Sequence, residues 1–275
     1  VCDEEGIPYP NTLLPGEEAE ADPSTHWLRK PVRSGGGHGI EPWRGGTLGE
    51  GHVLQEYVDG RPASAAFVAD GQRSVLLGVS EQLIGREALG AHGYAWCGNI
   101  LPLALRSGER IDAIVQSVER TVARLTQRFG LRGVNGIDFV VANGRDGRLH
   151  PFLVEVNPRY TASMELRDRA YGLSALELHV RSFDGELPEF SLAERLDDPR
   201  VYGKGIVYAD EDVVMPRTAY WRREGRRDVP FSGERIEAGH PICTVLAEGE
   251  SRAGCWRRLV GKAEDVRKAL IGENL

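Results

Sequence analysis

The segment Phe152–Arg159 constrains the fold most, because it sets an acid and an amide two residues apart in an otherwise apolar strand. Side chains alternate between the two faces of a strand, so Glu155 and Asn157 are expected on one face. The same alternation predicts that Val154 and Val156 face the core. An arginine ends the segment, so charge and apolar packing meet on this one strand.

A second apolar run, Ile137–Val141, lies upstream, and the turn residues Asn143–Gly147 separate the two runs. This pattern predicts a β-hairpin that brings Asp138 onto the same face as Glu155 and Asn157. If these oxygen-bearing side chains had no partner there, the free energy of removing water from them would be unfavourable. A hard cation such as Mg²⁺, holding phosphate oxygens as its other ligands, would compensate. Turn capping or pairing with nearby arginines would also do so, and the hairpin alone does not decide between them.

A glycine-rich loop is the second distinctive feature. Trp27–Pro31 is predicted to be a short strand with Lys30 near its end, and it runs into Val32–Gly39, where four of the last five residues are glycine. Such a loop lets backbone N–H groups close on an anion and is free to open and shut. It has neither the Gly-Lys-Ser/Thr ending of a Walker loop nor the spacing of a dinucleotide fingerprint. A plain flexible connector has the same composition, so the loop alone does not decide the function.

An apolar strand that turns polar at its end, Val53–Gly60, follows the loop. Taken in order along the chain, these segments resemble the ATP-grasp superfamily over well more than half of the sequence. The resemblance implies an α+β fold in which two α+β subdomains clamp ATP. It also implies that Lys30 contacts the nucleotide phosphates, that the glycine loop closes over them, and that Gln55–Val58 is the hinge that holds adenine.

The hinge of this family works largely through backbone groups, so the resemblance implies that Glu56 and Val58 contact the edge of the base. Many members use a further acid for the ribose, but Pro62 and Ala63 occupy that neighbourhood in this chain, which leaves Asp59 as the substitute. The nucleotide-binding residues expected from the resemblance are Lys30, Ser34, Gly35, Gly36, Gly37, His38, Gln55, Glu56, Tyr57, Val58 and Asp59.

The same resemblance makes Asp138, Glu155 and Asn157 the ligands of Mg²⁺, with Mn²⁺ as an alternative ion. Arg159 is expected to face the phosphoryl group that is transferred. Several ligases of the family carry a further arginine where this chain has Gly136. Arg159, or an arginine from elsewhere in the chain, must therefore do more of the charge stabilisation.

Residues around Ser64, Gln82 and Tyr94–Pro102 are similar to a carboxylate–amine ligase branch that includes tyramine–glutamate ligases of methanofuran-type C1-cofactor synthesis. This narrower resemblance implies an ADP-producing ligase that works through an acyl phosphate, with glutamate and an aromatic amine as substrates. Asn99 is the catalytic residue expected on the substrate side. Two alternatives remain open: an ATP-grasp kinase or phosphotransferase that stops at phosphorylation, and a nucleotide-binding module without turnover.

Turn signals divide the chain into four predicted parts. Residues 1–26 are a lead-in segment left from a preceding domain, residues 27–90 the lid subdomain, and residues 91–199 the metal and catalytic subdomain. Residues 200–275 form a strand-rich accessory domain that packs on the rest or joins two copies into a homodimer. Because the chain starts without an initiator methionine and the family's amino-terminal domain precedes this point, we expect that part of the native protein is absent.

Hydrophobic periodicity predicts three helices. Apolar residues recur at helical spacing over Ile111–Phe129, and shorter helical patterns cover Leu173–His179 and the segment from Trp256 to Leu270. Each pattern leaves one apolar stripe to bury against a sheet.

Composition fits a soluble enzyme that acts on small molecules. A chain of 275 residues with 41% hydrophobic content can bury a sizeable core. Its net charge of −7 argues against nucleic-acid binding. No apolar run is long enough to cross a membrane, and no signal or lipidation motif is visible, which favours the cytoplasm. Its four cysteines are scattered, which indicates free thiols in a reducing compartment.

Overall fold

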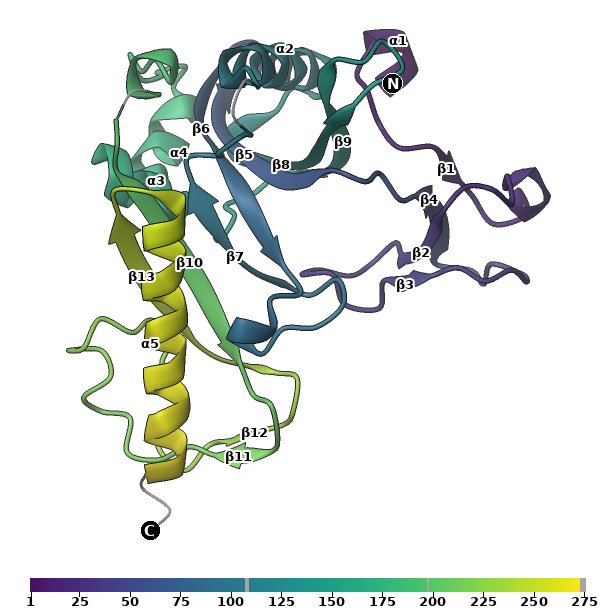
Figure 1. Cartoon of the computed structure of the whole chain (residues 1–275). Helices are drawn as coiled ribbons and strands as arrows, with labels where there is room; N and C mark the ends of the chain where they lie inside the picture. The colour runs from purple at the N-terminus through teal and green to yellow at the C-terminus, as the bar shows by residue number, and fades with distance from the viewer. Residues whose placement is uncertain (107–108, 197, 273–275) are drawn as a thin grey trace.

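Two antiparallel sheets organise the chain, and the computed structural model describes residues 1–106, 109–196 and 198–272. Figure 1 shows the smaller sheet standing to one side of the larger. The large sheet consists of β5 (Arg61–Asp70), β6 (Ser74–Ile84), β7 (Trp96–Leu101), β8 (Arg132–Asn143), β9 (Leu149–Asn157), β10 (Val201–Tyr208) and β13 (Pro241–Gly249), in the order β13-β10-β7-β6-β5-β8-β9. The small sheet consists of β1 (Thr12–Leu13), β2 (Trp27–Pro31), β3 (Glu41–Pro42) and β4 (His52–Glu56), in the order β1-β4-β2-β3.

Helices cover both faces of the large sheet, so the expected α+β class is confirmed. Strand β5 shows how its two faces are used: Ala65 and Phe67 lie in one apolar cluster, while the alternating Ala66 and Val68 lie in another. The remaining elements are α1 (Cys2–Glu5), α2 (Ile111–Phe129), α3 (Met164–Tyr171), α4 (Ala175–Phe183), α5 (Arg252–Gly272) and the short β11 (Val213–Val214) and β12 (Arg235–Ile236), with 3-10 turns at Glu18–Glu20, Glu87–Leu89 and Ala193–Arg195.

The three predicted helices are confirmed. Helix α2 has the predicted bounds and packs its apolar stripe, including Val118 and Val122, in the cluster that contains Phe67. Helix α4 begins where Ser174 accepts a hydrogen bond from the backbone N–H of Glu177 at 3.3 Å, which satisfies one of the free donors of its first turn. Helix α5 lies along β10 and β13 in Figure 1.

A β-bulge in the β8–β9 hairpin corrects one prediction. The hairpin itself is confirmed, with Asp138 opposite Glu155, but the next pair is Phe139 opposite Leu153. Val154 is thus an extra residue that strict alternation does not allow for. The prediction that Val154 faces the core was wrong: it lines the cleft between the two sheets, and Leu153 takes its place in the core.

The two sheets divide the chain differently from the predicted boundaries. The small sheet draws β1 from the predicted lead-in segment, and β5 and β6 from the predicted lid belong to the large sheet. Both β5 and β6 are buried along most of their length, which suits central strands of a two-faced sheet. The segment after residue 200 was expected to be a separate unit, but β10 pairs with β7 and extends the same large sheet.

The cysteines agree with the sequence analysis. All four are free, and Cys97, Cys243 and Cys255 are buried. Burial raises the pKa of the Cys243 thiol to about 12 and that of Cys255 to about 11, so neither is a reactive thiolate at neutral pH. Within the described ranges, no helix combines the length and the apolar character that a membrane crossing requires.

Gly98 tests whether the carboxyl-terminal strands are integral to the sheet. A Cβ at this position would lie 2.0 Å from the carbonyl oxygen of Lys204 on β10, and the residue has φ of 139°. We expect Gly98→Ala to lower the free energy of unfolding by roughly 2 kcal/mol or more, measured by urea denaturation. Gly261→Ala on α5 meets no atom within 4 Å and should leave stability unchanged or slightly raised. Equal effects of the two variants would contradict this packing.

Candidate functional site

A cleft of about 750 Å³ lies between the two sheets and gathers nearly all the candidate residues. The small sheet and its glycine loop contribute Lys30, Gln55 and the hinge, and the large sheet contributes the β8–β9 hairpin and Asn99. Of the residues predicted for the site, Ser34 and Asp59 are not among those that line the cleft. The Ser34 hydroxyl instead donates to the backbone carbonyl of His38 at 2.6 Å, which stabilises the loop itself.

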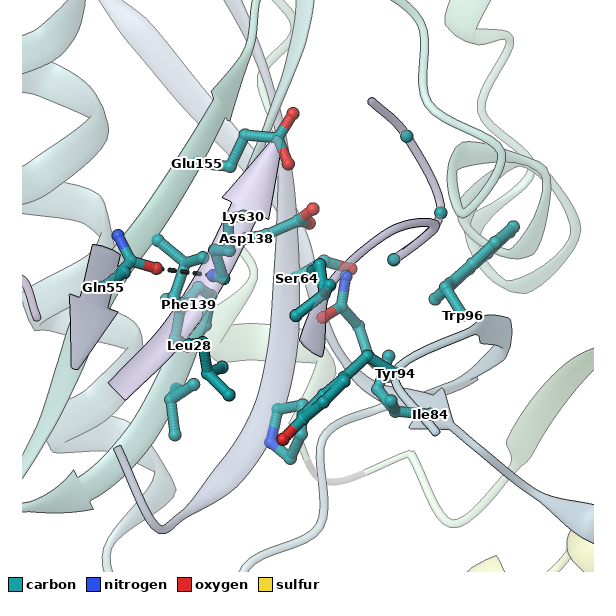
Figure 2. Close-up of a pocket in the computed structure, with 18 of the residues that line it drawn as sticks. Leu28, Lys30, Gln55, Ser64, Ile84, Tyr94, Trp96, Asp138, Phe139 and Glu155 are labelled. Carbon is teal, nitrogen blue, oxygen red and sulfur yellow. Dashed lines mark hydrogen bonds between the residues drawn. The ribbon is translucent and has the colours of Figure 1, made fainter. Parts of the chain in front are cut away.

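The three predicted metal ligands lie together. Asp138 and Glu155 are register partners on β8 and β9, and Figure 2 shows both side chains pointing into the cleft. The Asn157 amide donates to Asp138 Oδ2 at 3.4 Å and accepts from Arg159 Nη2 at 2.9 Å. Two carboxylates and an amide oxygen form a hard donor set of the kind that Mg²⁺ prefers. The described residues contain no cluster of three or more His, Cys, Asp or Glu at metal-binding range, so such an ion would need ligand oxygens as well.

Electrostatics at the hairpin favour a cation. Burial, and then the neighbouring charge of Glu155, raise the pKa of Asp138 to about 7, although hydrogen bonds from Gln82 and Asn157 and the charge of Arg159 act in the opposite direction. Two carboxylates that resist joint ionisation gain from a bound cation, because it favours the charged form of both.

Lys30 stands across the cleft from the hairpin. Its Nζ donates to Gln55 Oε1 at 2.5 Å, the bond drawn in Figure 2. Burial lowers the pKa of Lys30, while the charges of Glu155 and Asp138 raise it. The charges of Lys30 and of the two hairpin carboxylates therefore interact across the cleft.

The hinge leaves one backbone donor free. The N–H of Glu56 donates to Asn11 and that of Tyr57 to His26, whereas the N–H of Val58 has no partner within the part of the chain that the structure describes. A free donor at the edge of a cleft can bond the edge of a base, which supports the choice of Val58. Flat apolar surface for such a base comes from Leu28, Ile84, Val140 and Val154.

The glycine loop packs on the large sheet. The backbone N–H of Trp96 donates to the backbone carbonyl of Gly36 at 2.8 Å. A Cβ on Gly37 would lie 1.9 Å from the Tyr94 carbonyl oxygen. No side chain fits between the loop and the Tyr94–Trp96 segment, so glycine at position 37 is required for this contact. The loop thus closes one side of the cleft.

Asn99 and the residues after Arg159 extend the site beyond the β8–β9 hairpin. Asn99 is buried, and its amide bonds the hydroxyls of Ser64 and Ser80 and the indole N–H of Trp96. Sequence analysis missed the hydroxyls of Thr161 and Ser163, which also line the cleft. Their only sequence signal is that they follow directly after the Asn157–Arg159 segment.

The family is shown by sequence comparison. A family model of the ATP-grasp domain matches residues 2–163. The chain belongs to the ATP-grasp family. ATP and Mg²⁺ are the ligands that this family binds in its cleft, and the donor set of the hairpin and Lys30 fit them.

Individual relatives are distant. An uncharacterized protein of Methanocaldococcus jannaschii is 22% identical over 196 residues, which covers 71% of this chain but only 42% of that protein. The solved structure of an L-amino acid ligase from Bacillus licheniformis has a TM-score of 0.65 at 14% identity, covering 96% of this chain and 68% of that one. The biotin carboxylase domain of 2-oxoglutarate carboxylase from Hydrogenobacter thermophilus, in complex with MgADP and bicarbonate, has a TM-score of 0.65 at 15% identity, covering 96% of this chain and 62% of that one. These matches do not show which branch of the ATP-grasp family the chain belongs to, so the resemblance to tyramine–glutamate ligases stays a prediction.

Gly37 tests the contact between the loop and the sheet. We expect Gly37→Ala to weaken binding of MgATP, measured by isothermal titration calorimetry, by about tenfold or more, because the added methyl group prevents the loop from seating. Gly49→Ala, in an exposed loop of the small sheet with no atom within 4 Å, is the matched control and should bind normally. Normal MgATP affinity of Gly37→Ala would contradict the closing role of the loop.

Asp138 tests the electrostatics of the hairpin. A carboxyl group with a raised pKa destabilises the folded state once the pH exceeds its unfolded value, so this penalty grows from about pH 4 up to about pH 7. In metal-free buffer, we expect Asp138→Asn to raise the melting temperature relative to wild type by more at pH 8 than at pH 5, where only part of the penalty has developed. Thermal unfolding in EDTA at both pH values measures this. The same difference at both pH values would show that ionisation of Asp138 is not the cause.

Proposed function

We propose that this chain catalyses the ATP-dependent joining of a carboxylate to an amine through an acyl phosphate. The observation that carries the proposal is that Asp138, Glu155 and Asn157 share one cleft with Lys30 of the opposite sheet. The name of the similar L-amino acid ligase points in the same direction. The chain spans less than half of its M. jannaschii relative, so the activity of the whole protein is part of the proposal.

The apolar wall of the cleft and the Val58 N–H would hold the base of ATP. The glycine loop and Lys30 would hold its phosphates. Mg²⁺ held by Asp138, Glu155 and Asn157 supplies neutralisation of phosphate charge when it is bound. The loop excludes water, which protects a reactive acyl phosphate from hydrolysis.

The reaction has two steps. A carboxylate oxygen of the first substrate attacks the γ-phosphorus of ATP, and the bond from that phosphorus to the β-phosphate oxygen breaks. The products of this step are ADP and an acyl phosphate. The amine nitrogen then attacks the acyl carbon, and the tetrahedral intermediate expels phosphate as the nitrogen loses its extra proton. Arg159 donates to the oxygens that carry the developing charge, and its bond to Asn157 at 2.9 Å holds it beside the hairpin.

The finer assignment is glutamate with an aromatic amine in C1-cofactor synthesis. It rests on the resemblance of the residues around Ser64, Gln82 and Tyr94–Pro102, three parts that all contribute to the cleft. Small-molecule substrates, with no nucleic-acid partner, fit the net charge of −7. A cytoplasmic location and a homodimer through residues 200–275 are further parts of this proposal.

An ADP-release screen over carboxylate and amine pairs tests the function. A ligase releases ADP rapidly only when both substrates are present and yields an amide. The rival phosphotransferase would release ADP with the acid alone. A binding module without turnover would bind MgATP but release no ADP with any pair of substrates. Either of these two results would contradict the ligase assignment.

Glu155 tests the assignment of the hairpin. We expect Glu155→Gln to lower the turnover rate at least about 100-fold with the fold intact, because loss of one metal ligand removes several kcal/mol of charge stabilisation. Glu119→Gln removes the same charge from an exposed position on α2 and should keep full activity. ADP release is the measurement, with melting temperature as the check on folding. Near-normal turnover by Glu155→Gln would remove this residue from the mechanism.

A further inference from the structure

Arg167 is a buried arginine beneath the floor of the cleft. It belongs to α3 and is 1% exposed. Its guanidinium donates to the backbone carbonyl oxygens of Ser163 at 2.6 Å, Gly78 at 3.2 Å and Ser64 at 3.5 Å, and to Ser80 Oγ at 3.4 Å. Among the described residues, no carboxylate lies within ion-pair distance of it, and its Nε–H has no hydrogen-bond partner.

The charge of Arg167 is kept in spite of its burial. Burial lowers its pKa to about 10, so the guanidinium is still protonated at neutral pH. Carbonyl and hydroxyl dipoles solvate this charge without neutralising it. A buried charge without an ion partner is expensive to maintain, and such groups cluster at functional sites.

A chain of hydrogen bonds connects Arg167 to the cleft. Ser80 Oγ accepts from Arg167 at 3.4 Å and from Asn99 Nδ2 at 3.1 Å, which uses both of its lone pairs. Its own proton is left to donate to Ser64, either to the hydroxyl oxygen at 3.1 Å or to the backbone carbonyl oxygen at 3.5 Å. Ser64 Oγ also accepts from Asn99 Nδ2 at 3.1 Å. Since Ser80 Oγ has no lone pair left to accept from Ser64, the Ser64 proton is free to point away from this network.

Trp96 fixes the direction in which the hydrogen bonds of this network run. An indole N–H can only donate, and it donates to Asn99 Oδ1 at 3.1 Å. The Asn99 amide therefore turns its Nδ2 toward the two serines, and the reverse orientation would set donor against donor. Ser64 lines the cleft and is paired in register with Asp138, so its free hydroxyl lies on the floor beside the β8–β9 hairpin.

We propose that the Ser64 hydroxyl is a hydrogen-bond donor for a phosphoryl anion in the cleft, and that Arg167 is the positioning residue that orients and polarises it through Ser80 and Asn99. The ligand is the phosphate group of the acyl phosphate, or the phosphate that it releases. This inference rests on the proposed function and names the residue that holds the transferred group on the floor of the site.

Binding of inorganic phosphate to the protein saturated with MgADP tests the proposal, with isothermal titration calorimetry as the measurement. We expect Ser64→Ala and Arg167→Met each to weaken phosphate binding by about tenfold or more, because each removes a charge-assisted hydrogen bond or its polarising charge. MgADP affinity should stay within about twofold of wild type, since the proposal assigns Ser64 to the transferred phosphate and not to ADP.

Arg169→Met is the matched control. It removes the same charge from the same helix, but Arg169 is exposed and pairs with Glu248 at 3.2 Å. It should bind phosphate as wild type does. If Arg167→Met does not fold, Ser80→Ala is the substitute test. It interrupts the chain of hydrogen bonds without removing the buried charge, and it should also weaken phosphate binding.

The outcomes separate the two proposals. Unchanged phosphate affinity in Ser64→Ala, or an equal loss of phosphate and MgADP affinity in folded Arg167→Met, would overturn the role of these hydrogen bonds and leave a structural tie between α3 and the sheet. Failure of the wild-type protein to bind MgADP at all would overturn the proposed function itself, and this inference with it.

Discussion

The pairing of Asp138 with Glu155 is the constraint on which the site depends. Two carboxylates held opposite each other on a hairpin repel, and the pKa of Asp138 is raised first by its own burial and then by that repulsion. Among the residues that the structure describes, no ion pair offsets this repulsion, since Arg159 bonds Asn157 and Lys30 bonds Gln55. A divalent cation bound at this position would favour the ionised form of both carboxylates.

The rest of the structure holds that hairpin in place. Strands β5, β6 and β7 on one side of β8 supply buried neighbours, and α2 covers the apolar face behind them. The small sheet faces the hairpin with Lys30 and a glycine loop, and the loop reaches the large sheet through backbone contacts at Gly36 and Gly37. Binding of one nucleotide would thus bridge the two sheets across the cleft.

Much of this arrangement could be predicted from the sequence because it is local. The alternation around Glu155 and the turn at Asn143–Gly147 specify a hairpin, and the apolar stripe of α2 specifies a helix of the observed length. Other features depend on tertiary context. The bulge at Val154 has no local signal, the two-residue strand β1 is too short to leave a pattern, and the pairing of β10 with β7 joins residues far apart in sequence. The hydrogen-bond partners of Asn99 likewise come from separate strands, so its buried position could not be predicted from the sequence.

Anomalous scattering from Mn²⁺ in a crystal grown with ADP would show whether the hairpin holds the metal. Mn²⁺ takes oxygen ligands as Mg²⁺ does and can be located without ambiguity. We expect a peak within coordination distance of the Asp138 and Glu155 carboxylates and the Asn157 amide oxygen, next to the phosphates of the nucleotide. A peak elsewhere, or bound nucleotide with no metal at the hairpin, would contradict the role assigned to these three residues.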